Sequence, residues 1–191
     1  MMTIEQQLQQ LQATLDALRP CIPQVHAVGL EIAKCLRKGG KLLTCGNGGS
    51  ATDALHLSEE LVGRYKHDRP ALASICLCAD VSALTCIGND YGYDAVFARQ
   101  VQALGQPGDI LLAFTTSGNS SNILQAFEAA KQQQVSTVLV SGKDGGAAAG
   151  TCDFEIIVPS QSTARIQEVH TFILHQWLEL VEASLFPDLY R

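Results

Sequence analysis

Asp109-Ile-Leu-Leu-Ala-Phe-Thr-Thr-Ser-Gly-Asn-Ser-Ser121 is the stretch that decides the fold, because an apolar run of strand length passes directly into a hydroxyl-rich loop. The good helix formers of residues 122–131 follow this loop and predict a helix. In α/β proteins such a loop binds phosphate, since free backbone N–H groups and the positive end of the helix dipole meet the anion. The sequence therefore predicts an anion site between a buried strand and a helix N-terminus.

A second loop of the same kind is Cys45-Gly-Asn-Gly-Gly-Ser50, which also follows an apolar strand and precedes a predicted helix. Because the carboxyl ends of parallel strands meet at one edge of a sheet, ligands bind there in open α/β folds. Two such loops indicate one phosphorylated ligand held at that edge.

The pattern of strand, glycine turn and helix repeats from residue 41 to the end of the chain. Strands are predicted at 41–45, 71–77, 109–114, 136–141 and 154–158, and helices at 50–64, 80–88, 94–104, 120–133 and 163–186. Strands that are apolar throughout and alternate with helices form parallel sheets covered on both faces. We therefore expect an α/β fold, doubly wound and flavodoxin-like, with a five-stranded parallel sheet.

Two helices are predicted before this core. The first has a narrow apolar stripe at spacings of four and three, formed by Ile4, Leu8, Leu11, Leu15 and Leu18. The second has one apolar face, formed by Val25, Val28, Ile32 and Leu36. We expect a single domain over 1–191, with the helical pair of 1–39 serving packing and oligomerisation and an α/β core over 40–191.

The last predicted helix is apolar on most sides, and such a helix must be buried. Its apolar residues are Ile166, Val169, Phe172, Ile173, Leu174, Trp177, Leu178, Leu180 and Val181. A chain of 191 residues cannot easily bury it alone, so a subunit interface is expected.

Composition excludes several classes of protein. The net charge of -6 argues against a broad nucleic-acid surface, which needs a basic face. No apolar run approaches the ~18 residues of a membrane span, and the first residues lack the pattern of a signal peptide. The seven cysteines, an odd number, mostly lie in apolar runs and fit a reducing cytoplasm. Cys76 and Cys78 could form a metal site, but two small buried hydrophobes is the better interpretation.

Polar residues interrupt two of the apolar helices. His56 and Glu60 share one helix face, which suits two ligands of one metal, an acid/base pair or an ordinary surface pair. Gln167 and His175 are separated by about 12 Å of helical rise and about 80° of rotation, so they reach one ion only with extended side chains. His170 is the nearer companion of Gln167, and spacing alone would choose it. A hydrogen-bonded histidine in an interface core is the alternative for His175.

The segment Gly88-Asn-Asp-Tyr-Gly92 is either an ordinary turn, which its residue types favour, or a binding segment for substrate hydroxyls near the same sheet edge.

Taken together, the motifs resemble the sugar isomerase (SIS) family, and its phosphoheptose isomerase branch most closely. They occur in the family's order from about residue 40 to the end. They are Cys-Gly-Asn-Gly-Gly-Ser50, Asp53-Ala-Leu-His56, Glu59-Glu60-Leu-Val-Gly-Arg64-Tyr65, Gly-Asn-Asp90, Thr-Ser-Gly-Asn-Ser120, Ser141-Gly-Lys-Asp-Gly-Gly146 and Arg165-Ile-Gln-Glu-Val-His170.

The resemblance implies roles for individual residues. It implies one Zn²⁺ per subunit, with the ligands His56, Glu60, Gln167 and His175, and an acid/base pair of Glu60 and His175. It also implies substrate contacts from Asn47, Gly48, Gly49, Ser50, Glu60, Asn89, Asp90, Thr115, Thr116, Ser117, Ser120 and Gln167. Finally, it implies a cytoplasmic homotetramer with sites between subunits.

Some positions depart from the family pattern. Ala51-Thr52 replaces a frequent His-Cys, and Thr115 replaces a usual serine. Ala164 replaces a frequent aspartate, which bears on sugar recognition but not on the reaction.

The expected activity is an aldose–ketose isomerisation of sedoheptulose 7-phosphate through an enediol, for bacterial surface glycans. The alternatives are a sugar-phosphate sensor and a non-catalytic adaptor similar to the DnaA initiator-associating protein. The tail Ser184-Leu-Phe-Pro-Asp188 looks like that branch, but its members lack the glutamate and the final histidine present here.

Overall fold

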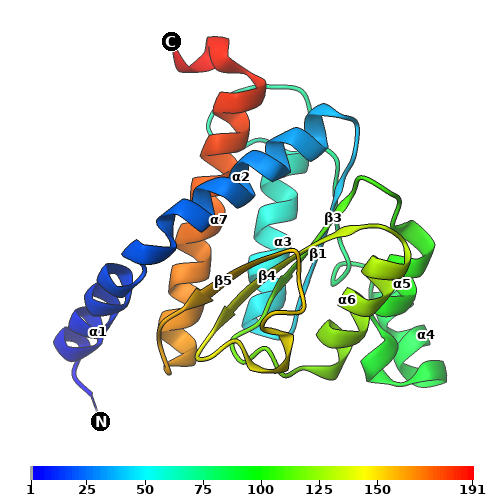
Figure 1. Ribbon diagram of the computed structural model, residues 1–191, viewed down its shortest axis with the longest axis horizontal. Coiled ribbons are helices and arrows are strands. Elements are labelled where there is room, and N and C mark those ends of the chain that lie inside the picture. Colours follow the sequence, from blue (N-terminus) through cyan, green and yellow to red (C-terminus); the bar gives the residue numbers. More distant parts are fainter. Residues whose placement is uncertain (1) are drawn as a thin grey trace.

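A computed structural model describes residues 2–191 and shows a five-stranded parallel sheet between two layers of helices (Figure 1). The strand order is β2-β1-β3-β4-β5, and every neighbouring pair is parallel. This is the order of flavodoxin-like folds, so the predicted fold class is confirmed.

The strands are β1 (Leu42–Gly46), β2 (Ser74–Cys76), β3 (Ile110–Phe114), β4 (Ser136–Gly142) and β5 (Phe154–Val158). The α-helices are α1 (Ile4–Ala17), α2 (Ile22–Arg37), α3 (Gly49–Val62), α4 (Val81–Tyr91), α5 (Ala98–Leu104), α6 (Ser121–Gln132) and α7 (Thr163–Leu185). Short 3-10 turns are η1 (Arg19–Cys21), η2 (Tyr93–Ala95), η3 (Gly146–Ala148) and η4 (Pro187–Tyr190). No helix among residues 2–191 has both the length and the apolar character that crossing a membrane requires.

Alternate residues of each central strand pack on opposite faces, because side chains along a strand alternate in direction. On β3, Leu112 and Phe114 belong to the core formed with α2, α3 and α7, whereas Leu111 and Ala113 belong to the core formed with α5 and α6. Both cores consist of buried apolar side chains, which explains why both faces of β3 are apolar.

The N-terminal helical pair is present, but its two helices differ in burial. On α2 the predicted face is buried, with Val28 and Ile32 each 1% exposed. The stripe of α1 is covered only toward its end: Leu18 is buried, whereas Ile4 is 87% exposed. One anchor for α1 comes from α7, where Arg165 Nη1 donates to the carbonyl of Gln7 at 2.8 Å.

The burial predicted for α7 is confirmed for most of its apolar residues, but one step of the reasoning was wrong. The chain buries this helix by itself, because α2, α3 and the sheet surround it; Trp177 Nε1 donates to the carbonyl of Val25 at 2.8 Å. Phe172 is the exception, with 45% exposed. A second subunit is therefore not needed to bury α7.

Three predicted boundaries differ from the structure. Only Ser74–Cys76 of the predicted strand 71–77 pairs in the sheet. The predicted helix 94–104 is divided into η2 and α5. The predicted helix 80–88 begins at Val81, where Asp80 caps the N–H of Ala83, and continues to Tyr91, because Gly92, with a φ of 85°, supplies the stop. Residues 88–91 are thus helical, and the ordinary turn offered as one alternative is wrong for them.

We predict that buried His170 makes the protein sensitive to mild acid. Its ring is fully buried against Phe114, with Nε2 at 3.2 Å from the carbonyl oxygen of Ser141. Burial lowers the pKa of His170 to about 4. Between that pH and the unfolded pKa of about 6.5 the unfolded chain binds the extra proton, so the free energy of unfolding should fall by up to roughly 3 kcal/mol on acidification across this interval.

Urea unfolding of the wild type and of His170→Leu between pH 4.5 and 7 measures this contribution. The variant lacks the titrating ring, so its stability should fall less steeply on acidification. If the free energy of unfolding falls equally with pH in both proteins, His170 is not responsible for the acid sensitivity.

Candidate functional site

The candidate site lies where α3 and α7 run side by side in the same direction on one face of the sheet (Figure 1). Residues at successive turns of α7 therefore contact residues at successive turns of α3. Gln167 lies against Gly49, the Thr171 hydroxyl donates to Asp53 Oδ1 at 3.0 Å, and the His175 ring lies 5.0 Å from that of His56.

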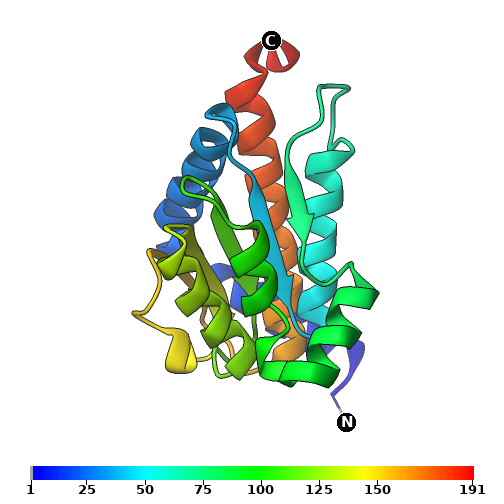
Figure 2. The ribbon, with the colours of Figure 1, turned by 90° about the vertical axis from the view of Figure 1, so that its right-hand side faces the viewer.

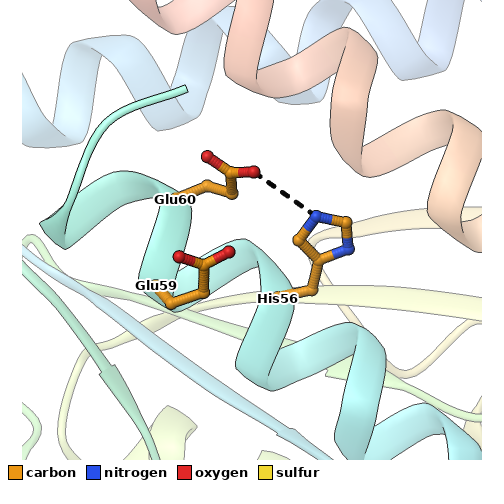
Figure 3. Close-up of side chains that lie close together, drawn as sticks. All are labelled: His56, Glu59 and Glu60. Atoms are coloured by element: carbon orange, nitrogen blue, oxygen red, sulfur yellow. Dashed lines mark ion pairs between the residues drawn. The ribbon is translucent and has the colours of Figure 1, made fainter. Parts of the chain in front are cut away.

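His56, Glu60 and His175 form the central cluster. Figure 3 shows His56 and Glu60 pointing toward each other from one helix, with His56 Nε2 at 3.5 Å from Glu60 Oε1. The His175 ring meets His56 edge-on from α7. Both α3 side chains are partly buried, which limits their hydration.

Glu59 also approaches this cluster, which sequence reasoning did not predict. Groups of three or more His, Cys, Asp or Glu side chains can hold a metal ion when their ligand atoms lie close together. Among residues 2–191 one such group has its ligand atoms within 4.8 Å of one another, namely His56, Glu59 and Glu60 (Figure 3). Imidazole nitrogen and carboxylate oxygen are donors that Zn²⁺ accepts. The donor set therefore fits the predicted ion, and the identity of its ligands stays a prediction.

His170 and His175 face different neighbours, and the choice between them as a metal ligand stays a prediction. His170, the nearer companion of Gln167 along the helix, faces the sheet and contacts Ser141 and Phe114. His175 faces α3, as Gln167 does, since the Gln167 amide lies over Gly49. Spacing along one helix could not reveal this, because it says nothing about where the neighbouring helix lies.

Burial shifts two pKa values at the α3–α7 contact. It lowers the pKa of His175, and nearby His56 acts in the same direction, while Glu60 opposes both. It raises the pKa of Asp53 to about 6, against the hydrogen bond from Thr171 and the charge of His56. Asp53 Oδ2 is buried and makes no hydrogen bond within the described chain. Sequence reasoning missed Asp53 as a site residue, although its spacing of three from His56 places both on one helix face.

The glycine loop between β1 and α3 needs glycine at two positions, one for its backbone conformation and one for a close contact with Gln167. Gly48 has a φ of 57° and a ψ of -122°, a conformation that L side chains rarely adopt. A Cβ on Gly49 would lie 2.5 Å from Gln167 Nε2. Ser50 is buried in the first turn of α3. The loop thus brings a helix N-terminus and the Gln167 amide together.

The hydroxyl-rich loop between β3 and α6 is held by its own hydrogen bonds and by a neighbouring loop. The Thr115 hydroxyl accepts from the N–H of Gly118 at 3.2 Å, and Asn119 Oδ1 accepts from the N–H of Ala147 at 2.9 Å. Ser120 begins α6 without a side-chain capping bond in the described structure. Its hydroxyl and the first-turn N–H groups therefore remain suited to an anion.

An amide pair joins the two predicted anion loops. Asn47 Nδ2 donates to Asn122 Oδ1, and Asn122 Nδ2 donates to Asn47 Oδ1, both at 2.9 Å. The Tyr93 hydroxyl also donates to Asn47 Oδ1, at 3.0 Å. Sequence reasoning did not predict Asn122 or Tyr93, because neither residue is adjacent to Asn47 in the chain.

Asn89 and Asp90 lie apart from these contacts. Both are exposed near the end of α4, at the same edge of the molecule as the start of α3 (Figure 2). Asn89 Nδ2 donates to Asp90 Oδ1 at 2.7 Å, and within residues 2–191 neither side chain is hydrogen-bonded to the glycine loop or the hydroxyl loop. Their predicted contact with substrate remains a prediction.

Comparisons with known proteins agree with the motifs. The sequence model of the SIS domain matches residues 6–142. The phosphoheptose isomerase of Shewanella loihica is 49% identical over 181 residues, which cover 93% of this chain and 92% of that protein.

Two solved structures are similar over nearly their whole length. The phosphoheptose isomerase of Neisseria gonorrhoeae has a TM-score of 0.87 at 37% identity and covers 93% of this chain and 95% of its own. That of Francisella tularensis has a TM-score of 0.87 at 36% identity and covers 95% of this chain and 98% of its own.

We predict that alanine has different effects on stability at the two adjacent glycines, Gly48 and Gly49. Gly48→Ala should lower the free energy of unfolding by about 1–3 kcal/mol, because its backbone conformation disfavours a Cβ. Gly49→Ala should leave that free energy nearly unchanged, because its Cβ meets only the movable end of Gln167, which shifts aside. Urea unfolding compares the two variants, and a crystal structure of Gly49→Ala locates Gln167. Equal destabilisation by both would contradict this account.

Proposed function

The chain belongs to the SIS domain family, and from that membership we propose that it is an aldose–ketose isomerase. Its substrate is sedoheptulose 7-phosphate and its product is D-glycero-D-manno-heptose 7-phosphate, used for bacterial surface glycans such as lipopolysaccharide. The observation that carries the proposal is the convergence of His56, Glu60 and His175 beside two anion-ready loops. The names of relatives that are 36–49% identical support the substrate.

The two loops would hold the phosphate and the sugar hydroxyls. Thr115, Thr116, Ser117 and Ser120 offer hydroxyls at the N-terminus of α6, and residues 47–50 offer backbone N–H groups at that of α3. Asn89 and Asp90 would contact hydroxyls of the same substrate. Binding the distant phosphate fixes C1 and C2 of the sugar and so lowers the entropic cost of reaction.

The reaction moves one proton between carbon atoms and one between oxygen atoms. In this mechanism Glu60 removes the proton from C1 of the ketose and returns it to C2. His175 carries a proton between the two oxygens, and its lowered pKa keeps the ring neutral and able to accept one. The C2 oxygen gains a proton and the C1 oxygen loses one, so the aldehyde forms without any external reactant.

His56, Glu60, Gln167 and His175 would hold one Zn²⁺. When bound, the ion supplies a Lewis acid that stabilises negative charge on the sugar oxygens. Glu60 is asked to be both ligand and base, which requires that its carboxylate oxygens divide these roles. Gln is an unusual zinc ligand, so affinity for the ion should be moderate.

An exposed apolar surface supports assembly into a homotetramer. Ile4, Leu8, Ile22 and Phe172 are exposed apolar residues of α1, α2 and α7. Ile22 and Phe172 line one groove together with Leu15 and Leu18, and exposed apolar residues that gather in this way are typical of protein–protein interfaces. We place the assembly in the cytoplasm, in keeping with seven cysteines, all free thiols.

The expected activity is turnover of sedoheptulose 7-phosphate that chelator reduces and zinc restores. Glu60→Gln keeps the size of the side chain but cannot accept the C–H proton. It should abolish both turnover and exchange of the substrate's C1 hydrogen with deuterated water. Mass spectrometry of recovered sugar phosphate measures the exchange.

Inorganic phosphate is the control ligand for Glu60→Gln, since the anion loops are unchanged and phosphate binding should survive. Exchange at the wild-type rate in this variant would remove Glu60 from the role of base. A wild-type protein with zinc that neither turns over nor exchanges the substrate would contradict the proposed function and favour the adaptor or sensor.

Light scattering at micromolar concentration tests the assembly. We expect the mass of four chains for the wild type and a smaller mass for Phe172→Glu, because a charge placed in an apolar interface is costly. Glu31→Gln, at a partly exposed position of α2, is the control and should keep the tetramer. A monomer mass for the wild type would rule out sites shared between subunits.

A further inference from the structure

We infer that a buried ion pair between Arg69 and Glu182 positions the two groups proposed as acid and base, Glu60 and His175. The pair lies at the C-terminal end of the α3–α7 contact, with Arg69 Nε at 3.1 Å from Glu182 Oε1. Its side chains are 0% and 1% exposed. The inference rests on the proposed function, because it assigns these residues a role in the same reaction.

Arg69 acts on Glu60 through the backbone. The last carbonyls of a helix have no partner within the helix, and α3 ends at Val62. Arg69 Nη2 donates to the carbonyl of Glu60 and Nη1 to that of Leu61, both at 2.7 Å. One planar guanidinium thus fixes the final turn from which the Glu60 side chain projects.

Glu182 acts on His175 through Tyr65. Its carboxylate accepts from three successive backbone N–H groups, those of Tyr65, Lys66 and His67, at 3.2, 3.3 and 3.4 Å. This holds the segment that follows α3 against α7. The Tyr65 ring stacks on the His175 ring, with centroids 5.7 Å apart and planes at 21°. The stack restricts rotation of the imidazole proposed to move protons.

Stability alone is a weak explanation for this arrangement. Replacing a buried ion pair by well-packed apolar side chains is often neutral or stabilising, because both charges lose their hydration. Here further hydrogen bonds of the pair reach the backbone of Glu60 and the segment that carries Tyr65, besides those to the carbonyls of Leu61 and Pro70 and from the Tyr190 hydroxyl. Those bonds fix the positions of the backbone that carries Glu60 and of the segment that carries Tyr65, which apolar side chains could not do.

The same segment offers a matched control. Lys66 and Glu179 also join it to α7, with Nζ at 2.6 Å from Oε2, but these side chains are 46% and 45% exposed. Exposed pairs contribute little, since water and salt screen them. Glu179→Gln removes one charge from α7, as Glu182→Gln does, without removing a hydrogen bond of the buried pair.

The test compares the zinc-loaded variants Glu182→Gln, Glu179→Gln, Tyr65→Phe and Tyr65→Leu. Glu182→Gln and Tyr65→Leu should each lower kcat about tenfold or more while KM stays within about twofold, as found when partners of active-site groups are removed. Tyr65→Phe keeps the ring and should retain kcat, as should Glu179→Gln. The double variant Glu182→Gln/Tyr65→Leu should lose no more than the larger single loss, because both act through one contact.

A second readout does not depend on activity. In metal-free protein, stacking on Tyr65 shifts the NMR signals of the His175 ring protons, which a His175→Gln variant identifies by their loss. Glu182→Gln should move these signals, and Glu179→Gln should not. If the wild type fails to turn over the sugar phosphate, the proposed function fails, while these signals still decide whether Glu182 positions His175.

Two results would overturn the inference. One is a Glu182→Gln protein whose free energy of unfolding falls, as expected on losing a buried charge, while kcat per folded molecule and the His175 NMR signals stay as in the wild type. The other is equal kcat in Tyr65→Leu and Tyr65→Phe, which decides the matter if Glu182→Gln does not fold.

Discussion

The site depends on one constraint: α3 and α7 lie on the same face of a parallel sheet and run in the same direction. Connections between parallel strands are right-handed, so each helix returns antiparallel to the strands and parallel to the other helices of its layer. Residues at matching depths on the two helices therefore meet at every turn. Gln167 meets Gly49 near one end, and His175 meets His56 further along. The buried contacts of Trp177 and Leu57 keep the helices at this spacing.

The same topology explains where an anion can bind. In the order β2-β1-β3-β4-β5 the chain direction across the sheet reverses between β1 and β3, and open α/β folds bind ligands at such a switch point. The loops that leave these two strands diverge to opposite faces, one into α3 and the other into α6. The mutual hydrogen bonds of Asn47 and Asn122 span the gap between them. The loops proposed to bind phosphate and the α3 residues proposed for the reaction thus belong to separate parts of one fold.

Sequence patterns predicted what is local in the chain. The uniformly apolar runs of strand length and the glycine turns predicted the sheet and its layers, and the spacing of His56 and Glu60 placed both on one face of α3. Features that depend on a neighbouring element were missed, because sequence patterns do not say which elements are neighbours. They are the partners Asn122 and Tyr93 of Asn47, the orientation of His170, and the burial of α7 within its own chain. Gly88 suggested a helix end, yet the hydrogen bonds of α4 continue to Gly92, where the backbone conformation itself stops the helix. The roles of Gln167 and His175 came from family resemblance, and helical spacing could not have supplied them.

The ion pair between Arg69 and Glu182 also constrains how the protein is made. The two residues are separated by 113 positions, and the Glu182 carboxylate further accepts from the hydroxyl of Tyr190 at the very end of the chain. During synthesis, the proposed catalytic group on α3 leaves the ribosome long before the one on α7 is made. Arg69 and the segment after α3 then lack their acceptor, and contacts of such high sequence separation form late. The nascent chain can therefore build its sheet progressively, but it completes the proposed site only after α7 has been released.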